Sequence, residues 1–276
     1  MNGEVSGRPK REEKFHDEWA VRTDIISIDV VKSNESITAP ELRYITQQLG
    51  LLRGKKLIDV GCGLGEASVY FAIKGADVTS IDISESMLQA VKELAARNHV
   101  SIKTYKSNIE ELFFGEKFDI VYAGNLFHHV NVESALKEFT LLLKEDGVLV
   151  SWDPLAYNPF INLYRFIARK VRTLDEHPLT MRDISLFRKY FPHVKVRYFW
   201  LSSLLIFIYM VIFQLRNPNK ERFWKVVVDE GDKWAWLYKP LEAFDTFILK
   251  LFPFLGFLCW NVVIVARKNR SHNYVY

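Results

Sequence analysis

The segment that most restricts the possible folds is residues 56–65, where a short apolar run carries an acid and passes directly into glycines at alternate positions. The run includes Asp59, and the glycines are Gly61, Gly63 and Gly65. Because glycine lacks a Cβ, such a loop can turn sharply and lie against a ligand. The pattern predicts a buried strand, a ligand-binding loop and then a helix.

The same alternation of apolar runs and helical patterns continues along the chain, which is typical of a parallel α/β sheet. Runs rich in valine and isoleucine are expected as buried strands. Strands are predicted at 56–60, 77–81, 101–105, 118–123, 148–152, 193–200 and 261–268, and helices at 39–50, 66–74, 84–98 and 133–143.

Composition sets outer limits on function. The 276 residues are 49% hydrophobic, which indicates a folded protein. The formal charge of +4 is too small to argue for binding to nucleic acid, although a small positive charge suits an anionic membrane surface. With only two cysteines, a disulfide framework and a zinc site are not expected, and no metal is predicted. Residues 1–18 are polar, which excludes an ordinary secretory signal and favours a catalytic part that faces the cytosol.

The loop chemistry distinguishes between nucleotide ligands. A nicotinamide-binding loop needs a third glycine and places a pyrophosphate at the helix N-terminus, but that position is Glu66, an anion. S-adenosylmethionine has no phosphate, and its amino group suits Asp59, while the amides of Gly61–Gly65 approach its carboxylate and ribose. Taken alone, the loop fits a plain tight turn equally well.

Two further positions favour an adenosyl ligand. Asp82 ends the next strand, from which a carboxylate can accept both ribose hydroxyls, and it also suits an N-cap of the following helix. Asn108, after the third strand, can bind the adenine amino group while the Ile109 amide meets a ring nitrogen; alternatively, Asn108 only caps a turn.

Six motifs together resemble the class I S-adenosylmethionine-dependent methyltransferases of the ubiquinone-biosynthesis and small-molecule type. They are the runs 59–65, 81–82, 108–109, 118–121, 125–130 and 143–147. The resemblance covers about residues 55–154. It implies a Rossmann-like fold with a seven-stranded, mostly parallel sheet, an antiparallel last strand and helices on both faces.

The resemblance also implies S-adenosylmethionine as cofactor. Asn108 departs from the aspartate common at that position, which weakens the electrostatics of adenine recognition. The expected cofactor-binding residues are Asp59, Gly61, Cys62, Gly63, Gly65, Asp82, Ile83, Met87, Asn108, Ile109, Gly124 and Asn125.

Methyl transfer from a sulfonium requires positioning of the acceptor, and a base where the acceptor must lose a proton. His128 and His129 follow the fourth strand, and of the two we favour His129 as the base; the alternative is a helix-capping or core histidine. Three further candidates are His16 in an N-terminal lid and, beyond the fifth strand, Asp153 and Tyr157.

Residues 201–260 are expected to be a hydrophobic helical insertion before the last strand. Residues 199–215 carry no charge but are slightly shorter than the roughly 20 residues that cross a bilayer. Residues 244–258 contain two charges and a proline, and the linker between them is rich in tryptophan. Because the chain must return to the sheet, a single transmembrane helix is excluded.

We therefore hypothesise that the insertion dips into one leaflet as a helical hairpin and delivers a lipophilic acceptor; the alternative is a hydrophobic cap or a dimer interface. The expected organisation is lid helices at 1–50, a methyltransferase core at 51–200, the insertion at 201–260, and the last strand with a polar tail at 261–276.

The leading prediction is methylation of a small lipophilic molecule, such as a quinone, isoprenoid or lipid-linked sugar, at oxygen or carbon. It would occur at the cytoplasmic face of a membrane, without nucleic acid. A non-catalytic S-adenosylmethionine-binding regulator of a membrane complex is the second possibility, and a nicotinamide oxidoreductase, disfavoured by Glu66, is the third.

Overall fold

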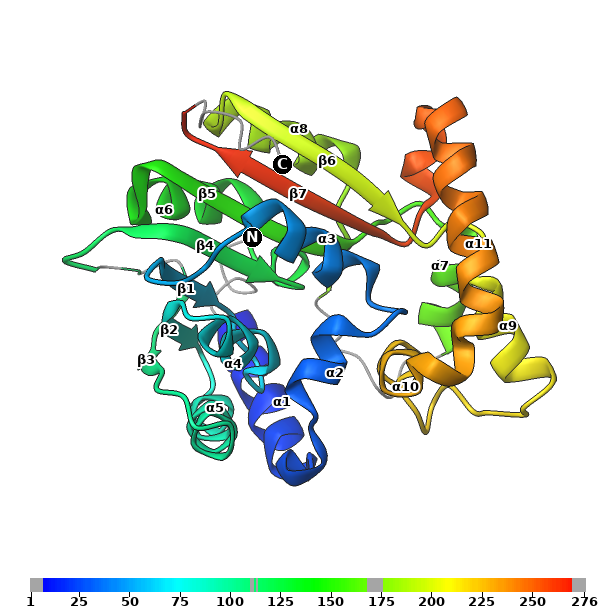
Figure 1. Ribbon diagram of the computed structural model, residues 1–276, viewed down its shortest axis with the longest axis horizontal. Helices are drawn as coiled ribbons and strands as arrows, with labels where there is room; N and C mark the ends of the chain where they lie inside the picture. Colours follow the sequence, from blue (N-terminus) through cyan, green and yellow to red (C-terminus); the bar gives the residue numbers. More distant parts are fainter. Residues whose placement is uncertain (1–6, 110–111, 113, 168–175, 270–276) are drawn as a thin grey trace.

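A seven-stranded sheet with the order β3-β2-β1-β4-β5-β7-β6 forms the centre of the protein (Figure 1). The computed structural model describes residues 7–109, 112, 114–167 and 176–269. Only β7 runs antiparallel to its neighbours, which confirms the predicted fold. The strands are β1 Lys56–Val60, β2 Asp77–Asp82, β3 Lys103–Lys106, β4 Phe118–Gly124, β5 Leu143–Pro154, β6 His193–Phe199 and β7 Asn261–Arg267.

Alternate residues of the strands supply two separate hydrophobic cores, one on each face of the sheet. Leu57 and Val78 join the first core, whereas Ile58 and Ile81 join the second. Since successive side chains of a strand point to opposite faces, near-continuous apolar runs are what a sheet covered on both sides requires.

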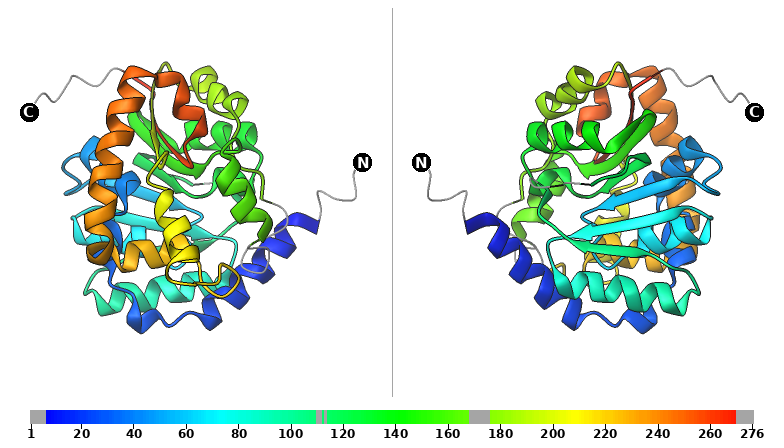
Figure 2. Two further views of the ribbon diagram at one scale, coloured as in Figure 1. Left: turned by 90° about the vertical axis from the view of Figure 1, so that its right-hand side faces the viewer. Right: turned by 90° about the vertical axis from the view of Figure 1, so that its left-hand side faces the viewer.

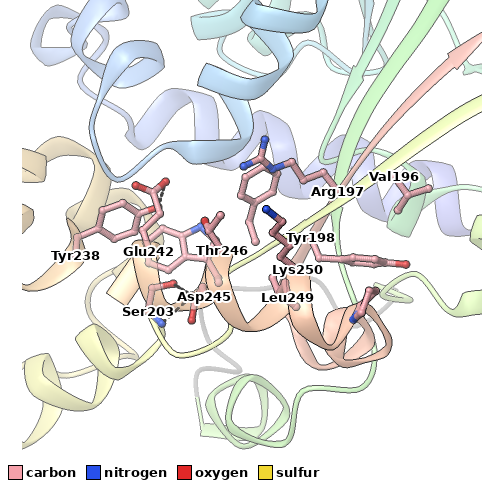
Figure 3. Close-up of a pocket in the computed structure, with 13 residues that line it drawn as sticks. Val196, Arg197, Tyr198, Ser203, Tyr238, Glu242, Asp245, Thr246, Leu249 and Lys250 are labelled. Atoms are coloured by element: carbon pink, nitrogen blue, oxygen red, sulfur yellow. Dashed lines mark hydrogen bonds between the residues drawn. The ribbon is translucent and has the colours of Figure 1, made fainter. Parts of the chain in front are cut away.

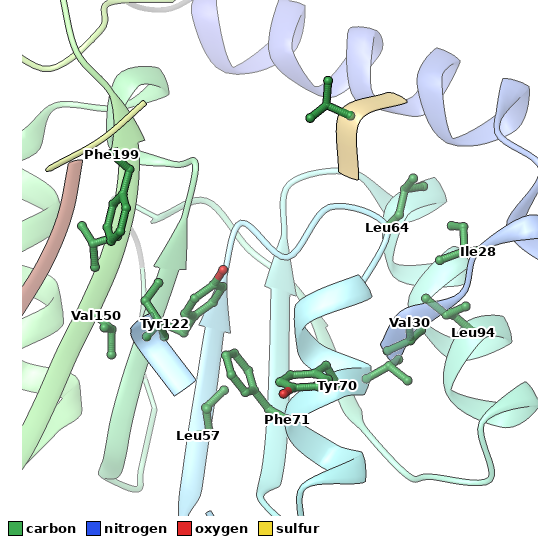
Figure 4. Packing of buried hydrophobic residues seen from close by; sticks show 14 of the residues in the cluster. Ile28, Val30, Leu57, Leu64, Tyr70, Phe71, Leu94, Tyr122, Val150 and Phe199 are labelled. Carbon is green, nitrogen blue, oxygen red and sulfur yellow. The ribbon is translucent and has the colours of Figure 1, made fainter. Parts of the chain in front are cut away.

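The first core lies against α4 (Glu66–Ile73) and α5 (Glu85–Arg97), where Phe71 packs edge-on against Tyr122 with ring centroids 5.0 Å apart (Figure 4). The second core lies against α6 (Val132–Leu142) and α8 (Met181–Tyr190). Helices thus cover both faces, as predicted.

Three helices precede the sheet. They are α1 (Arg8–Arg22), α2 (Val30–Glu35) and α3 (Pro40–Leu49). The predicted helix at 39–50 is present as α3. Residues 15–29 divide into the second half of α1 and a short 3-10 turn, because Asp24 accepts a hydrogen bond from the Ile26 N–H and starts a new turn.

Two helices after β5 were not predicted. The first is α7 (Pro159–Ile167), and the second is α8, which begins with a capping box between Thr180 and Asp183. Both are amphipathic and short, and they lie between the fifth and sixth strands, where no helix was predicted. Residues 168–175, which join them, lie outside the described part of the chain.

The segment between β6 and β7 is helical, as predicted, but it is not a simple hairpin. It contains α9 (Leu205–Ile212), α10 (Phe223–Asp229), α11 (Gly231–Leu251) and a 3-10 helix, η6 (Pro253–Leu258). The three α-helices stand together at one end of the sheet, with α7 beside them (Figures 1 and 2).

The uncharged stretch at 199–215 is divided by a turn that α11 holds in place. Asp245 of α11 is buried and accepts hydrogen bonds from the backbone N–H groups of Leu201, Ser202 and Ser203 and from both serine hydroxyls. These charge-assisted bonds stop β6 and start α9. Among the described residues, none of the helices is both long enough and apolar enough to cross a membrane.

Candidate functional site

The glycine loop after β1 packs tightly at both ends and is open in the middle. Gly61, Gly63 and Gly65 all have positive φ angles, of 72°, 53° and 87°. A Cβ would lie 2.6 Å from the Leu126 side chain at Gly61 and 2.7 Å from Val91 at Gly65, whereas at Gly63 it would meet nothing within 4 Å. The outer glycines therefore serve packing, and Gly63 leaves room for a ligand to approach the backbone.

Asp59 offers one carboxylate oxygen without a protein partner. Its side chain is fully buried; Oδ2 accepts a hydrogen bond of 2.5 Å from the Ser68 hydroxyl, and Oδ1 has none among the described residues. Burial raises the pKa of Asp59 to about 7, against the smaller lowering effect of Ser68. A cation such as an ammonium group would satisfy this oxygen and stabilise the charged form.

Asp82 lies at the end of β2 and braces the same loop. Oδ2 accepts a hydrogen bond of 2.9 Å from the Gly63 N–H, and Oδ1 accepts one of 2.9 Å from the Ser84 N–H. Burial raises the pKa of Asp82, although these backbone bonds and His16 lower it. Each carboxylate oxygen still has a second lone pair, so hydroxyl groups of a ribose can also bind here.

The neighbouring strand ends bring the other predicted cofactor residues to the same edge. The Ser107 N–H donates to the Asp82 carbonyl, so Asn108 and Ile109, both half-buried, follow directly after β3 beside Asp82. Met87 is fully buried in the first core. Ile83 is half-buried, and Cys62 is buried. Burial raises the pKa of the Cys62 thiol well above its usual range, which makes it unreactive.

On the other side of β1, the chain turns sharply after β4. Asn125 has φ +57°, its N–H donates to the Trp152 carbonyl at 2.7 Å, and its side chain is exposed. At Gly124, a Cβ would clash with the Tyr122 hydroxyl. The predicted cofactor residues therefore gather along the carboxyl ends of β1, β2, β3 and β4, the edge where open α/β sheets bind ligands.

Of the two adjacent histidines, His128 is the one held by a carboxylate of the sheet. Its Nδ1 lies 2.9 Å from Oδ1 of Asp153, which also accepts the His128 backbone N–H at 3.2 Å. Both side chains are buried, and burial raises the pKa of Asp153 well above its usual range. The sequence analysis favoured His129 as the base, but this pairing favours His128, since a carboxylate on one ring nitrogen fixes the ring and its tautomer.

Helix α1 covers this edge of the sheet in the position expected of a lid. The Ser84 hydroxyl and the Ser86 N–H donate to Asp17 at 2.5 and 3.3 Å, and Lys106 pairs with Glu13 at 2.7 Å. These bonds tie α1 to the beginning of α5 and the end of β3. His16, on the same helix, thereby comes close to the cofactor edge.

Glu12 completes a cluster that the sequence analysis missed. Its Oε2 lies 3.5 Å from Nε2 of His16 and 3.3 Å from Nδ1 of His129, and the two histidine rings are 5.9 Å apart. Burial raises the pKa of Glu12, but the contacts and charges of His129 and His16 outweigh this and hold it well below its usual range. The four-residue spacing of Glu12 and His16 on one helix could have indicated that these two side chains meet. No local pattern indicated that His129 lies beside them.

Tyr157, the last of the predicted catalytic residues, lies away from this cluster. Tyr157 accepts a hydrogen bond of 3.0 Å from the Met181 N–H and packs against Phe257, so its hydroxyl ties together two loops beyond β5. His177 has an exposed side chain, and its N–H donates to the His128 carbonyl at 2.8 Å. His177 therefore supports the His128 turn through its backbone.

The insertion reaches the lid. The Arg222 guanidinium carbon lies 3.9 Å from the ring centroid of Trp19 on α1, a cation–π contact, and burial lowers the Arg222 pKa. Thr38 and Ser36 donate to the carbonyls of Val227 and Val228 in α10. The lid helices and the insertion therefore close over the same end of the sheet.

A separate hollow of about 350 Å³ lies between the edge strand β6 and α11 (Figure 3). Arg197, Tyr198, Glu242, Thr246 and Lys250 are among the residues that line it. Three strands separate β6 from β1, which at about 4.8 Å per strand puts the hollow roughly 19 Å from the glycine loop. It is therefore not part of the cofactor cleft.

Part of this chain is similar to known methyltransferases. Residues 58–151 match the family model described as "Methyltransferase domain". Among curated relatives, the protein named ubiquinone biosynthesis O-methyltransferase of Actinobacillus pleuropneumoniae is 37% identical over 115 residues, which are 39% of this chain and 49% of that protein. The protein of the same name from Coxiella burnetii is 36% identical over 115 residues, covering 41% and 49%. The chain thus spans about half the length of these relatives.

Two solved structures share the fold at low sequence identity. Magnesium protoporphyrin IX methyltransferase from Synechocystis PCC 6803, with bound S-adenosylhomocysteine, has a TM-score of 0.51 at 16% identity over 70% of this chain and 94% of that one. An S-adenosylmethionine-dependent methyltransferase from Mesorhizobium loti has a TM-score of 0.52 at 18% identity, covering 82% and 97%. At these identities the likeness concerns the fold alone.

Proposed function

We propose that this chain, in which residues 58–151 match a methyltransferase domain, is a class I S-adenosylmethionine-dependent methyltransferase. It transfers a methyl group to an oxygen of a small lipophilic acceptor at a membrane surface. The relatives named as ubiquinone biosynthesis O-methyltransferases support oxygen as the atom methylated and a lipophilic acceptor. The acceptor and the membrane contact are parts of this proposal.

The observation that carries the proposal is a buried carboxylate with one unpartnered oxygen beside an open glycine loop. Asp59 Oδ1 suits the ammonium group of the cofactor, the Gly63 backbone has room above it, and Asp82 suits the ribose hydroxyls. When bound, the cofactor supplies an electrophilic methyl group on a sulfonium, which leaves as a neutral thioether. A pyrophosphate has no place here, since Glu66 stands at the start of α4.

His128 is the proposed proton acceptor. Methyl transfer to a hydroxyl requires that its proton leave, and an imidazole oriented by Asp153 can take it. Asp153 is proposed as the positioning residue, because its carboxylate contacts the His128 ring. The short 3-10 turn Phe127–His129 after β4 holds the ring at the edge where the cofactor binds.

Calorimetry tests the cofactor site. We expect S-adenosylhomocysteine to bind the full chain and NAD not to bind, and Asp82→Ala to weaken the first by about tenfold through loss of charge-assisted hydrogen bonds. Asp119→Asn, at the opposite end of β4, is the matched control and should leave affinity unchanged. Binding of NAD in preference to S-adenosylhomocysteine would refute the assignment.

Turnover tests the acceptor and the base. Release of S-adenosylhomocysteine is measured with hydroxylated aromatic acceptors that carry either a long isoprenoid chain or none. We expect the long-chain acceptor to be preferred, and His128→Gln and Asp153→Asn to lower kcat by about 100-fold or more with unchanged cofactor affinity. No turnover with any acceptor, despite tight cofactor binding, would favour the non-catalytic regulator.

The outer face of α11 supports the membrane part of the proposal. Trp236, Phe244, Phe247 and Leu251 are between 53% and 64% exposed, and their spacing puts them on one stripe of the helix. In a water-soluble setting such a stripe is normally covered. Further exposed apolar side chains lie on α7, α9 and η6: Phe160, Leu163, Phe166, Leu205, Ile212, Phe252 and Phe254.

Charge on the same helix fits an anionic leaflet. Lys239 and Lys250 are exposed, whereas Glu242 pairs with Arg43 at 2.7 Å and Asp245 is buried. An apolar stripe flanked by lysines is typical of a helix that lies in the membrane interface. The contact we propose is thus this face of α11, and not insertion of residues 199–215, because Ile206, within α9, is fully buried in the first core.

Sedimentation with liposomes tests the contact. We expect the chain to pellet with vesicles of phosphatidylcholine and phosphatidylserine and far less with phosphatidylcholine alone, and the double variant Phe244→Ser with Phe247→Ser to remain in the supernatant. Leu141→Ser, at a 65% exposed position of α6, is the control and should still pellet. Equal binding by the double variant would refute a role for this face.

A further inference from the structure

A carboxylate and two imidazoles converge where α1 meets the turn after β4, at a point the methyl-transfer proposal does not use. One ligand atom from each of Glu12, His16 and His129 can be chosen so that all three lie within 4.8 Å of one another. Glu12 and His16 come from one helix at a four-residue spacing, and His129 comes from 113 residues further along the chain (129 − 16).

These side chains lie at ion-pair distances, but no hydrogen bond of good geometry joins them. Glu12 is only 7% exposed, and neither of its carboxylate oxygens has a hydrogen-bond partner among the described residues. The same holds for Nδ1 of His129, which is a buried atom. Buried polar atoms normally have partners, so several unpartnered atoms in one cluster call for an explanation.

The distances fit a tetrahedral metal ion. Zinc bonds to imidazole nitrogen and carboxylate oxygen are about 2.0–2.2 Å long, which puts tetrahedral ligands roughly 3.3–3.5 Å apart. Oε2 of Glu12 lies 3.3 Å from Nδ1 of His129 and 3.5 Å from Nε2 of His16. These edges are too long and poorly aligned for good hydrogen bonds, but they match two edges of a coordination tetrahedron.

We infer that Glu12, His16 and His129 form a binding site for a divalent transition metal of the zinc class. Two imidazoles and one carboxylate suit zinc, cobalt or iron(II) and are unsuited to magnesium or calcium, which prefer oxygen ligands. The low cysteine content, from which no zinc site was expected, bears only on thiolate ligands. Three protein ligands leave one position for water or for an oxygen of another molecule.

The site would join the lid to the core. Glu12 and His16 belong to α1, and His129 belongs to the turn at the cofactor edge, so the ion adds a clamp to the hydrogen bonds of Asp17. The inference does not depend on methyl transfer. The same metal site would form in a chain that binds no cofactor, because each metal ligand is a side chain of this protein.

The test uses the full chain after treatment with a chelator and dialysis. Calorimetry with zinc chloride measures stoichiometry and affinity, and the visible absorption of added cobalt(II) reports tetrahedral coordination. We expect one ion per chain with intense cobalt bands. Hydrogen exchange across residues 8–22 should slow when zinc is added. Absence of saturable binding would overturn the inference.

Variants locate the ion. Glu12→Gln, which preserves size, and His16→Asn, which keeps a polar side chain, should each weaken zinc binding by at least about 100-fold. Two controls should bind zinc as the unaltered chain does. They are His193→Asn, on the far edge strand, and Glu176→Gln, whose carboxylate lies near His128 and His129. Equal loss in the His193 variant would mean non-specific surface binding, and loss only in the Glu176 variant would place the ion between Glu176, His128 and His129. Either result overturns the inference.

Folding and cofactor checks keep the outcomes separate. Each variant is compared by thermal unfolding without metal and by its affinity for S-adenosylhomocysteine. A variant that unfolds early is replaced by His129→Asn, which removes the third ligand from the core side. In these variants, loss of zinc binding with retained cofactor binding supports the metal site, and retained zinc binding overturns it. The cofactor assignment is judged separately, by the affinity of the unaltered chain for S-adenosylhomocysteine.

Discussion

Replacing Asp59 by asparagine separates the role of this carboxylate in binding from its effect on stability. Its pKa is raised from 3.8 to about 7 by burial. The folded chain therefore binds more protons than the unfolded chain between these two values, so this group makes the protein less stable as the pH rises through that window. The effect levels off above about pH 7.

The expected magnitude follows from the shift. At 1.36 kcal/mol per pKa unit, Asp59 lowers the free energy of unfolding by about 2 to 3 kcal/mol more at about pH 8 than at about pH 5. Asparagine keeps the size of the side chain and can still accept from the Ser68 hydroxyl. Asp59→Asn should thus lose this pH dependence and be more stable than the unaltered chain at the higher pH.

Urea unfolding of the cofactor-free chain at the two pH values measures the difference, and calorimetry measures the affinity for S-adenosylhomocysteine. In the unaltered chain the affinity should rise about tenfold per pH unit up to about pH 7, since only the ionised carboxylate pairs with the ammonium group. Asp59→Asn should bind weakly at every pH. The control Asp119→Asn loses a surface ion pair and should be destabilised equally at both pH values. An Asp59→Asn variant with the same pH dependence of stability as the unaltered chain would refute the reasoning.

Three further predictions concern packing and buried charge. Gly65→Ala should destabilise the protein by about 1–3 kcal/mol in urea unfolding, because its Cβ would meet Val91 at a positive φ, whereas Gly63→Ala should cost less stability and mainly weaken cofactor binding in calorimetry. Asp245→Ala should lower the free energy of unfolding by about 3 kcal/mol or more, because it leaves buried N–H and hydroxyl donors unpaired; a loss below about 1 kcal/mol would contradict this. Glu41→Gln should raise the free energy of unfolding by about 2 kcal/mol more at about pH 8 than at about pH 5, because burial raises the pKa of Glu41 to about 7 and glutamine carries no charge. The same effect of Glu41→Gln at both pH values in urea unfolding would refute this prediction.

The sheet was largely predictable because its strands are short apolar runs of fixed length. The runs at 56–60 and 118–123 became β1 and β4 within one residue, since both faces of a parallel sheet are buried and the whole run must be apolar. The start of β3 was placed two residues early, because β3 is an edge strand with exposed side chains and lacks that pattern. Helix α8 was not assigned, although Thr180 and Asp183 have the spacing of a capping box.

The long apolar segment shows the limit of hydropathy. A run without charges at 199–215 predicts only that these side chains leave water, and it does not say what covers them. In the structure part of the run ends β6, part packs into the first core through Phe207 and Met210, and part remains exposed. Asp245, which argued against a membrane span in the sequence, proved to be the residue that holds the intervening turn.

The sequence by itself determined the α/β fold, the glycine loop and the acids at the ends of the first two strands, because each depends on residues that are neighbours along the chain. Only the tertiary structure decided that Asp153 holds His128 and that Glu12 meets His129. Those partners are separated by 25 and 117 residues (153 − 128 and 129 − 12), and they meet because the parallel strands end at one edge and α1 packs across it. Contacts of this kind depend on how the helices and strands pack, so they cannot be predicted from residues that are neighbours along the chain.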